Sequence, residues 1–243
     1  MERLDKILAN AMIGSRKEVV KLIRAGVVTC DEKTVTDPSF KVDPNLCPIM
    51  VNGTPLCYRE HYHLMMNKPQ GYICATEDLR EQTVLDLLPD EEYPKHKLFP
   101  AGRLDKDTEG FVFLTTDGKL AHRITGPKNH VNKKYYVEVN TPITKDFIQK
   151  FLDGITIDDG YRCKRAFLEP LTENTCYLTI FEGKFHQIKR MFEAMGSTVT
   201  FLKRVQIGSV MLDETLEKGG FRELSAEEIK LLELVPKEFS KEK

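Results

Sequence analysis

The stretch Gly102-Arg103-Leu104-Asp105-Lys106-Asp107-Thr108-Glu109-Gly110 is a polar loop bounded by two glycines. It leads directly into Phe111-Val112-Phe113-Leu114-Thr115, a run of apolar and β-branched residues that predicts a buried strand. Catalytic groups are often found on loops that a rigid strand holds in place. The stretch therefore predicts both a central strand of the fold and a candidate site at the start of that strand.

The carboxylates of this loop allow three interpretations. Asp105 and Asp107 are typical of an ordinary turn, in which they accept hydrogen bonds from backbone amides. Asp105, Asp107, Glu109 and Gly110 also fall on positions 1, 3, 5 and 6 of a calcium-binding EF-hand loop. That motif requires a glutamate where this chain has Thr116, and a helix where a strand is predicted, so calcium is disfavoured. The third interpretation is a nucleophilic carboxylate, which needs a nearby cation and a partly dry pocket.

Two later stretches carry groups that suit such a site. Lys133-Lys134-Tyr135-Tyr136-Val137 opens a predicted strand, where successive side chains point to opposite faces, so one tyrosine faces solvent or a cleft unless it simply packs. In the stretch of residues 182–192, the part from His186 onward predicts a helix, and His186, Gln187 and Lys189 lie beside its apolar face. This helix is either an exposed basic helix or the element that brings Lys189 to a loop aspartate as its cation.

The hydrophobic pattern from residue 59 onward predicts a large α+β domain. Its strands and helices are typical of a mixed, mainly antiparallel sheet flanked by helices. The predicted strands are residues 62–66, 111–115, 135–139, 176–180 and 198–204. The predicted helices are residues 83–87, 119–123, 144–152, 186–195 and 226–234, the last opened by a capping box from Ser225 to Glu228.

The N-terminal residues predict a separate small module. Leu4, Ile7, Leu8 and Ala11 have the spacing of one buried helix face, and Ser15 to Glu18 form a capping box that starts a second helix. Short apolar stretches between Val27 and Val51 predict a few small strands. The periodicity is lost around residues 52–60, which predicts a linker. We therefore expect two domains, residues 1–58 and residues 59–243.

The distribution of charge suggests a basic face. The net charge is -1, from 36 basic and 37 acidic residues, and by itself argues against a nucleic-acid partner. Basic residues nevertheless cluster in residues 1–24, 119–134 and 184–204, whereas acidic residues gather from Asp213 onward. A solvated surface is the simpler interpretation of one cluster, but three clusters around one candidate site favour contact with a phosphate backbone. The candidate phosphate contacts of the N-terminal module are Arg3, Lys6, Arg16, Lys17 and Arg24.

Composition and missing motifs exclude several classes of protein. No apolar run approaches the roughly 20 residues of a membrane span, and the N-terminus lacks the apolar segment of a signal peptide. The six cysteines form no C-x-x-C pair, which predicts reduced thiols, so we expect a soluble cytoplasmic protein without a membrane partner. The motifs of P-loop, dinucleotide-binding, zinc-protease and serine-hydrolase sites are missing, so neither a nucleotide cofactor nor a metal is expected.

Taken in order, the motifs of this chain resemble those of the RsuA-type ribosomal RNA pseudouridine synthases. The resemblance covers nearly the whole chain and rests on Arg3 to Lys6, Met66 to Tyr72, Gly102 to Asp105, Lys133 to Val137, Glu182 to Met191 and Arg204 to Gly208. It implies a pseudouridine synthase fold, preceded by a small RNA-binding module of the kind found in a small-subunit ribosomal protein.

The resemblance also implies roles for individual residues. Asp105 matches the nucleophile, Tyr135 the tyrosine that stacks on the target base, and Lys189 the basic residue paired with the aspartate. Many pseudouridine synthases carry arginine at the last position, and lysine cannot form the same two-pronged pair. Further RNA contacts are expected from Arg103, His186, Gln187, Arg190 and Arg204.

The implied reaction isomerises a uridine of 16S rRNA to pseudouridine, by resemblance uridine 516. The target must leave the base stack, which requires a stacking ring and a basic surround. No cofactor or metal is implied, because nothing is oxidised and no group is lost. The expected partner is ribosomal RNA in a partly assembled small subunit, bound by a monomer. A synthase for large-subunit rRNA and a non-catalytic assembly factor remain alternatives, and base attack, sugar attack and sugar proton abstraction all stay open as routes.

Overall fold

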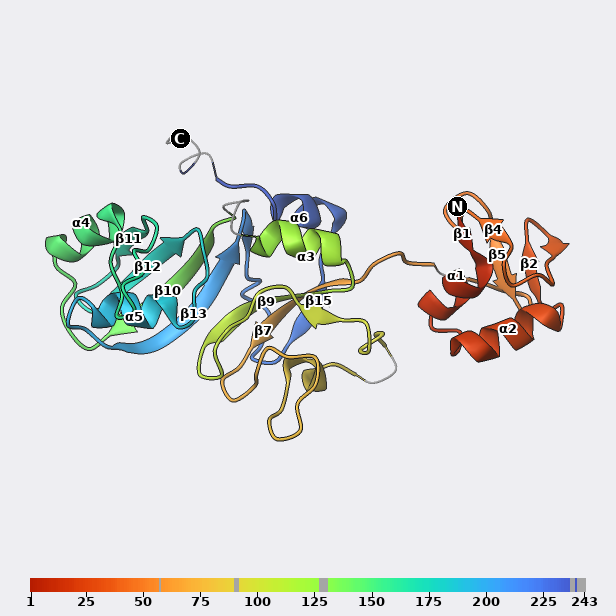
Figure 1. The fold of residues 1–243 in the computed structure, drawn as a ribbon, viewed down its shortest axis with the longest axis horizontal. Helices are drawn as coiled ribbons and strands as arrows, with labels where there is room; N and C mark the ends of the chain where they lie inside the picture. The colour runs from red at the N-terminus through yellow and green to blue at the C-terminus, as the bar shows by residue number, and fades with distance from the viewer. Residues whose placement is uncertain (57, 90–91, 127–130, 237–238, 240–243) are drawn as a thin grey trace. The chain divides into compact units, whose positions relative to one another are not determined.

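The computed structural model describes all of the chain except residues 57, 90–91, 127–130, 237–238 and 240–243. The chain divides into two compact units, Met1–His61 and Tyr62–Lys243. Each unit buries hydrophobic clusters of its own, and Figure 1 labels the helices and strands that enclose them.

The first unit packs two helices against short strands. Helices α1 (Leu4–Asn10) and α2 (Arg16–Arg24) both turn an apolar face into one core. Helix α2 begins at the predicted capping box, in which Ser15 Oγ accepts a hydrogen bond from the Glu18 amide and the Glu18 carboxylate accepts one from the Ser15 amide. Strands β3, β2, β5 and β6 pair in that order, and β1 pairs with β4. Their bounds are β1 (Glu2–Arg3), β2 (Val28–Cys30), β3 (Lys33–Thr34), β4 (Lys41–Val42), β5 (Ile49–Val51) and β6 (Thr54–Pro55).

A mixed sheet forms the centre of the second unit. Among the described residues its main path runs β11-β12-β10-β13-β9-β7-β15, with β14 beside β13 and β8 beside β9. Strands β13 and β9 pair in parallel, and the other pairs along this sheet are antiparallel. The predicted α+β class with a mainly antiparallel sheet is confirmed. The strand bounds are β7 (His63–Lys68), β8 (Phe99–Pro100), β9 (Glu109–Thr115), β10 (Lys133–Val139), β11 (Phe167–Pro170), β12 (Thr175–Ile180), β13 (Val199–Ile207), β14 (Val210–Met211) and β15 (Phe221–Glu223).

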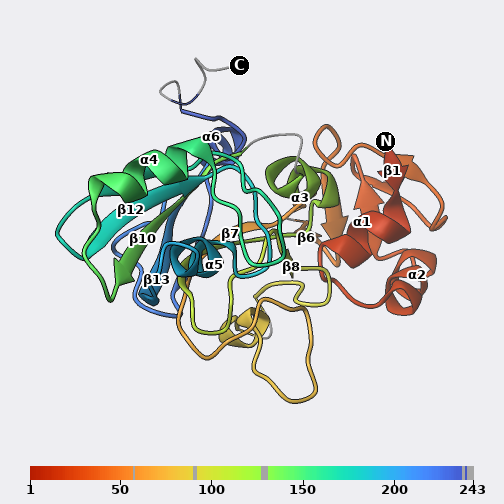
Figure 2. The same ribbon diagram turned by 60° about the vertical axis from the view of Figure 1, so that its left-hand side comes forward.

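Helices cover both faces of this sheet. Successive residues of β9 enter different cores: Val112 and Leu114 belong to the cluster that includes residues of α4 and α5, whereas Phe111 and Phe113 belong to the cluster that includes residues of α3. Figures 1 and 2 show α4 and α5 beside strands β10 to β13. The helix bounds are η1 (Val84–Leu87, a 3₁₀ helix), α3 (Gly118–Thr125), α4 (Lys145–Asp153), α5 (Gln187–Glu193) and α6 (Ala226–Leu231). None of the described helices has the length and apolar content that crossing a membrane requires.

The predicted elements are present, with shifted ends. The five predicted strands of the second unit correspond to β7, β9, β10, β12 and β13. The helix predicted at residues 186–195 is shorter, because His186 has a left-handed backbone with a φ of 49° and α5 begins after it. The prediction missed β8, β11, β14 and β15, short strands whose conformation depends on the partner strand more than on their own residues.

Candidate active site

A buried lysine holds the backbone of the polar loop. Lys68, at the end of β7, is fully buried, and its Nζ donates to the carbonyl oxygens of Thr108 (2.8 Å), Pro69 (3.0 Å), Asp105 (3.1 Å) and Lys106 (3.3 Å). Burial lowers the pKa of Lys68, although the surrounding acidic groups oppose this effect. Several carbonyls around one ammonium group fix the loop conformation and with it the direction of the Asp105 side chain.

A glycine allows the loop to approach β13. Gly110 has a φ of +100°, and it lies opposite Arg204 in the parallel pairing of β9 with β13. A Cβ atom at this position would lie 2.2 Å from the Arg204 carbonyl oxygen. Only glycine therefore fits, and this close approach brings the loop against the strand that carries Arg204.

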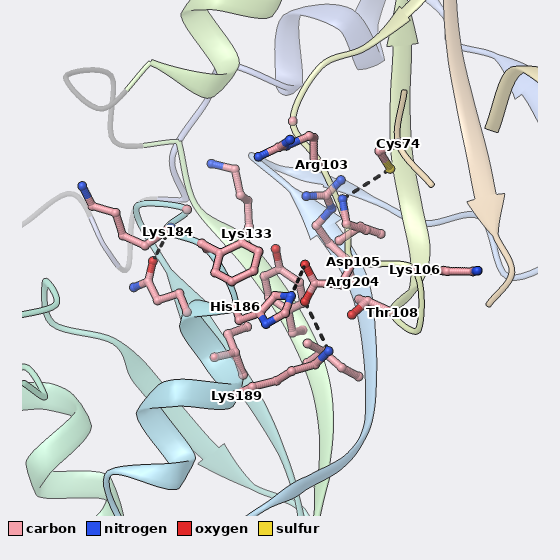
Figure 3. Close-up of a pocket in the computed structure, with 18 of the residues that line it drawn as sticks. Cys74, Arg103, Asp105, Lys106, Thr108, Lys133, Lys184, His186, Lys189 and Arg204 are labelled. Atoms are coloured by element: carbon pink, nitrogen blue, oxygen red, sulfur yellow. Dashed lines mark hydrogen bonds and ion pairs between the residues drawn. The ribbon is translucent and has the colours of Figure 1, made fainter. Parts of the chain in front are cut away.

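Two basic side chains of the 182–192 segment face Asp105. The Lys189 Nζ lies 3.3 Å from Asp105 Oδ2, and the His186 Nε2 lies 3.6 Å from Asp105 Oδ1, as the dashed lines in Figure 3 show. The Asp105 side chain is 28% exposed, so it is partly shielded but still accessible. The left-handed backbone of His186 turns its ring toward the loop just before α5 begins.

Lys189 is shared with a second carboxylate. Its Nζ lies 2.7 Å and 2.9 Å from the two carboxylate oxygens of Asp107, closer than to Asp105. Burial by itself would raise the pKa of Asp107, but the bond to Lys189 outweighs burial and lowers that pKa. Burial by itself would lower the pKa of Lys189, but its bonds to Asp107 and Asp105 outweigh burial and raise that pKa. Lys189 therefore stays charged beside Asp105.

A cavity of about 620 Å³ opens beside this ion pair. Asp105, Tyr135 and Lys189 all line it, so the structure brings together the three side chains that the resemblance singled out. Tyr135 lies on β10 with 7% of its surface exposed, and the apolar Ile188 and Leu202 complete the wall near it. The cavity offers a flat ring, a carboxylate and cations to one small polar ligand.

Of the expected RNA contacts in the second unit, some face the cavity and others are bonded to side chains of the same protein. Arg103 is exposed in the cavity wall and His186 faces Asp105. Gln187 is buried and bonds internally: its Nε2 donates to Glu182, and its Oε1 accepts from the Lys184 amide. Arg190 pairs with Asp158 and Asp159.

Arg204 is not a surface residue. It is 1% exposed on the cavity floor, and its Nε donates to the Phe111 carbonyl at 2.7 Å. Gln187 and Arg204 are both buried and both line the cavity, so their expected contact with RNA stays a prediction and applies to a nucleotide inside the cavity.

The basic clusters are partly neutralised within the chain. In the first unit Arg3 and Arg16 both lie near the Asp5 carboxylate, and Lys6 pairs with Glu2. Lys17 and Arg24 are exposed on α2.

In the 119–134 cluster, Arg123 pairs with Glu233 and Lys134 with Glu169, while Lys128 lies outside the described residues. Lys133 is buried, contrary to the expectation of an exposed basic cluster, because alternate residues of β10 face inward.

The carboxylates of the loop do not converge as a calcium site requires. Glu109 is buried and pairs with Lys218 at 2.8 Å, whereas Asp105 and Asp107 turn to Lys189. Within the described part of the chain, no three acidic, histidine or cysteine side chains form a group able to hold a metal ion. The geometry therefore favours the interpretation of Asp105 as a reactive carboxylate held by a cation.

Comparison with known proteins assigns the family. Residues 61–194 match the RNA pseudouridylate synthase family, and residues 2–46 match the S4 domain. The chain belongs to the RNA pseudouridylate synthase family. It is an RNA pseudouridine synthase that carries an N-terminal S4 domain, and the resemblance predicted from its motifs is confirmed.

Relatives match this synthase along almost their whole length. It is 50% identical over 234 residues to an uncharacterized RNA pseudouridine synthase of Bacillus subtilis, covering 95% of this chain and 98% of the relative. It is 41% identical over 229 residues to the ribosomal small subunit pseudouridine synthase A of Escherichia coli, covering 93% and 98%. A crystal structure of a pseudouridylate synthase matches with a TM-score of 0.68 at 37% identity, covering 96% of this chain and all of the other.

For three residues beside the candidate site, the sequence did not predict the supporting position that the structure shows. Lys68, Asp107 and Lys133 each act on the site through burial or pairing that depends on the tertiary fold. Lys68 lies in the quoted stretch Met66 to Tyr72, and Lys133 two residues before Tyr135 on the same face of a strand. The alternation of β10 is the signal that could have placed Lys133 beside Tyr135.

Proposed function

We propose that this synthase isomerises one uridine of 16S ribosomal RNA to pseudouridine, by resemblance uridine 516, with Asp105 as its nucleophile. Relatives at 41% identity from Escherichia coli and Salmonella typhimurium are named as synthases of the small ribosomal subunit, which supports this choice of RNA. The observation that carries the role of Asp105 is its ion pair with Lys189 at the wall of the cavity.

The site residues divide the work of holding and attacking one nucleotide. A uridine that has left its base stack enters the cavity, where the Tyr135 ring stacks on the base. The Lys189 ammonium group faces the Asp105 carboxylate, and partial burial limits the access of bulk water to it. Asp105 then attacks the base or the sugar, or a proton is taken from the sugar, and the uracil rejoins C1′ through carbon instead of nitrogen. The product is an isomer of the substrate, so the reaction needs no oxidant, reductant or group donor.

The proposed partner is ribosomal RNA in a partly assembled small subunit. The proposed location is therefore the cytoplasm, where ribosomes are assembled, and the proposed active form is a monomer. The S4 domain supports RNA binding beyond the target nucleotide. Its exposed Lys17 and Arg24, together with Arg103 near the cavity, contact phosphates, because charge alone is enough for that role.

The test is direct mapping of the product. The full-length protein is incubated with 16S rRNA, with large-subunit rRNA and with partly assembled small subunits, and pseudouridine is located along each RNA. We expect one new pseudouridine in small-subunit RNA. Product only in large-subunit RNA would replace the proposed substrate, and RNA binding without product in any sample would favour the non-catalytic assembly factor.

A further inference from the structure

Two buried cations lie on the floor of the active-site cavity. Lys133, the first residue of β10, is 9% exposed, and Arg204 of β13 is 1% exposed. Tyr135 and Arg204 are paired across the two strands, and Lys133 is two residues from Tyr135 along β10, so all three side chains face the same side of the sheet. All three line the cavity that also holds Asp105.

Neither cation has an anionic partner in the described part of the chain. The Lys133 Nζ donates to the Val131 carbonyl oxygen at 3.0 Å, and the Arg204 Nε donates to the Phe111 carbonyl oxygen. The Arg204 Nη2 atom is buried without a hydrogen-bond partner. Buried polar atoms are nearly always paired, and a buried charge without a partner is unfavourable.

The acids of the cavity wall are already engaged elsewhere. Asp105 faces Lys189 and His186, and Asp78 accepts hydrogen bonds from the amides of Arg80 and Glu81. Burial, with the nearby charge of Arg204, lowers the pKa of Lys133 to about 8. The floor of the cavity is therefore a positive site that an anion or a strong acceptor would complete.

We propose that Lys133 and Arg204 bind the carbonyl oxygens of the target uracil and stabilise the negative charge that this ring acquires during the reaction. The inference rests on the proposed function, since it places the uracil against Tyr135. The position of the pair favours a base over a phosphate, because both side chains line the cavity on the same side of the sheet as Tyr135 and are almost fully buried.

Each of the three possible routes of the reaction puts negative charge on the uracil. In sugar attack, an Asp105 oxygen bonds to C1′ and the electron pair of the C1′–N1 bond leaves with uracil, spread over its carbonyl oxygens. The Asp105–C1′ bond breaks when C5 bonds to C1′. In sugar proton abstraction, Asp105 takes the C2′ proton, the C2′–H pair forms a C1′–C2′ double bond, and the C1′–N1 pair leaves with uracil. The proton returns to C2′ when C5 bonds to C1′. In base attack, the Asp105 oxygen bonds to C6 and the C5–C6 π pair moves toward O4. The C1′–N1 bond then breaks, and the Asp105–C6 bond breaks as the C5–C6 double bond re-forms. The later C5 bond to C1′ releases the C5 proton, while N1 gains one.

The experiment compares Lys133→Met with the wild type and with Lys150→Met. Lys150 pairs with Asp146 on α4 and does not line the cavity, so its variant controls for the loss of one positive charge. Single-turnover rates at saturating protein and the Kd for RNA are measured with the same substrate RNA. We expect Lys133→Met to slow the reaction roughly 100-fold, as the loss of one charge-stabilising donor does. The Kd should change less than about twofold, and Lys150→Met should match the wild type in both quantities.

A substrate with 5-fluorouridine at the target position separates charge stabilisation from simple positioning. Fluorine withdraws electrons and stabilises negative charge on the ring, but it cannot leave C5 as a proton does, so the consumption of the nucleotide is measured. The deficit of Lys133→Met should be several-fold smaller with 5-fluorouridine than with uridine. An equal deficit with both bases, a normal rate, or a weaker Kd at a normal rate, as for a phosphate anchor, would overturn the inference. A wild type that consumes no uridine overturns the proposed function instead.

Discussion

Lys189 lies between two carboxylates that differ in exposure. The Asp107 side chain is 68% exposed and the Asp105 side chain 28%, although the shorter distances from Lys189 are those to Asp107. Asp107 therefore helps to hold the ammonium group in place, while Asp105 faces the cavity with its second oxygen toward His186. The outer acid positions the cation, and the cation faces the inner acid, an arrangement that suits the nucleophilic role proposed for Asp105.

Asp105→Asn should abolish turnover. Asparagine has nearly the shape of aspartate but lacks the anionic oxygen that attacks, so we expect the single-turnover rate to fall roughly 1,000-fold or more. The Kd for RNA should stay within about twofold, because few phosphate contacts change. The matched variant is Asp107→Asn, which removes the ion pair of Lys189 with Asp107 but keeps the one with Asp105. Its rate should stay within about tenfold of the wild-type rate. Similar losses in the two variants would contradict the distinct role given to Asp105.

The buried Lys133 should make stability depend on pH. Its pKa is lowered from 10.5 to about 8, so between these values the unfolded chain binds more protons than the folded one, and stability rises with pH. Below about pH 8 the full unfavourable effect of burial remains. Urea unfolding at pH 7 and pH 9.5 should therefore show Lys133→Met more stable than the wild type at pH 7, with that advantage reduced by about 2 kcal/mol at pH 9.5. An advantage independent of pH would show that Lys133 is not buried as a lowered-pKa amine.

The element that joins the fold to the site is the loop leading into β9. Its glycine-bounded, acidic character and the strand after it are visible in the sequence, because polar loop residues and an apolar run differ so clearly. The hydrogen bonds from Lys68 to the loop carbonyls could not be predicted from the sequence, since a lysine is usually exposed and its burial depends on the whole sheet.

The two ends of the 182–192 segment were predictable to different degrees. Ile188 and Phe192 have helical spacing and are buried as that spacing predicts. The left-handed turn at His186 was not predicted, because no local pattern requires it, yet it moves the start of α5 and turns the ring toward Asp105. The order of the motifs predicted that Asp105, Tyr135 and Lys189 lie at one site, and all three line one cavity. The same order could not predict which basic side chains are exposed and which are buried.

Gly110→Ala should disrupt the junction of β9 with β13. The added methyl group would lie 2.2 Å from the Arg204 carbonyl oxygen, at a φ of +100° that alanine rarely adopts. We expect the free energy of unfolding to fall by about 3 kcal/mol or more, measured by urea denaturation. Gly118→Ala is the control, since a Cβ there meets nothing within 4 Å and the residue opens helix α3. That variant should be unchanged or slightly more stable, and equal destabilisation of both would refute the account of Gly110.

At the scale of the whole molecule, we propose that a chain with almost no net charge binds RNA through charges placed on separate units. Many basic side chains pair with acids nearby, as Arg123 does with Glu233 and Lys134 with Glu169. Lys17, Lys21 and Arg24 instead are exposed at helical spacing along α2 of the S4 domain. In the proposed division of roles, the cavity holds the nucleotide, whereas α2 offers charge without base recognition.

The triple variant Lys17→Gln, Lys21→Gln, Arg24→Gln should therefore weaken RNA binding without changing the chemical step. Three lost phosphate contacts on single-stranded or irregular RNA reduce the slope of log Kd against log salt by about 2, and the single-turnover rate at saturating protein should stay constant. The charge-matched control replaces Lys145, Lys150 and Lys230, which are exposed on α4 and α6, and should leave the slope unchanged. Equal slopes for the first variant and the wild type would exclude α2 as a phosphate-binding face. A reduced slope together with a slower step at saturation would mean that α2 also helps to place the target nucleotide.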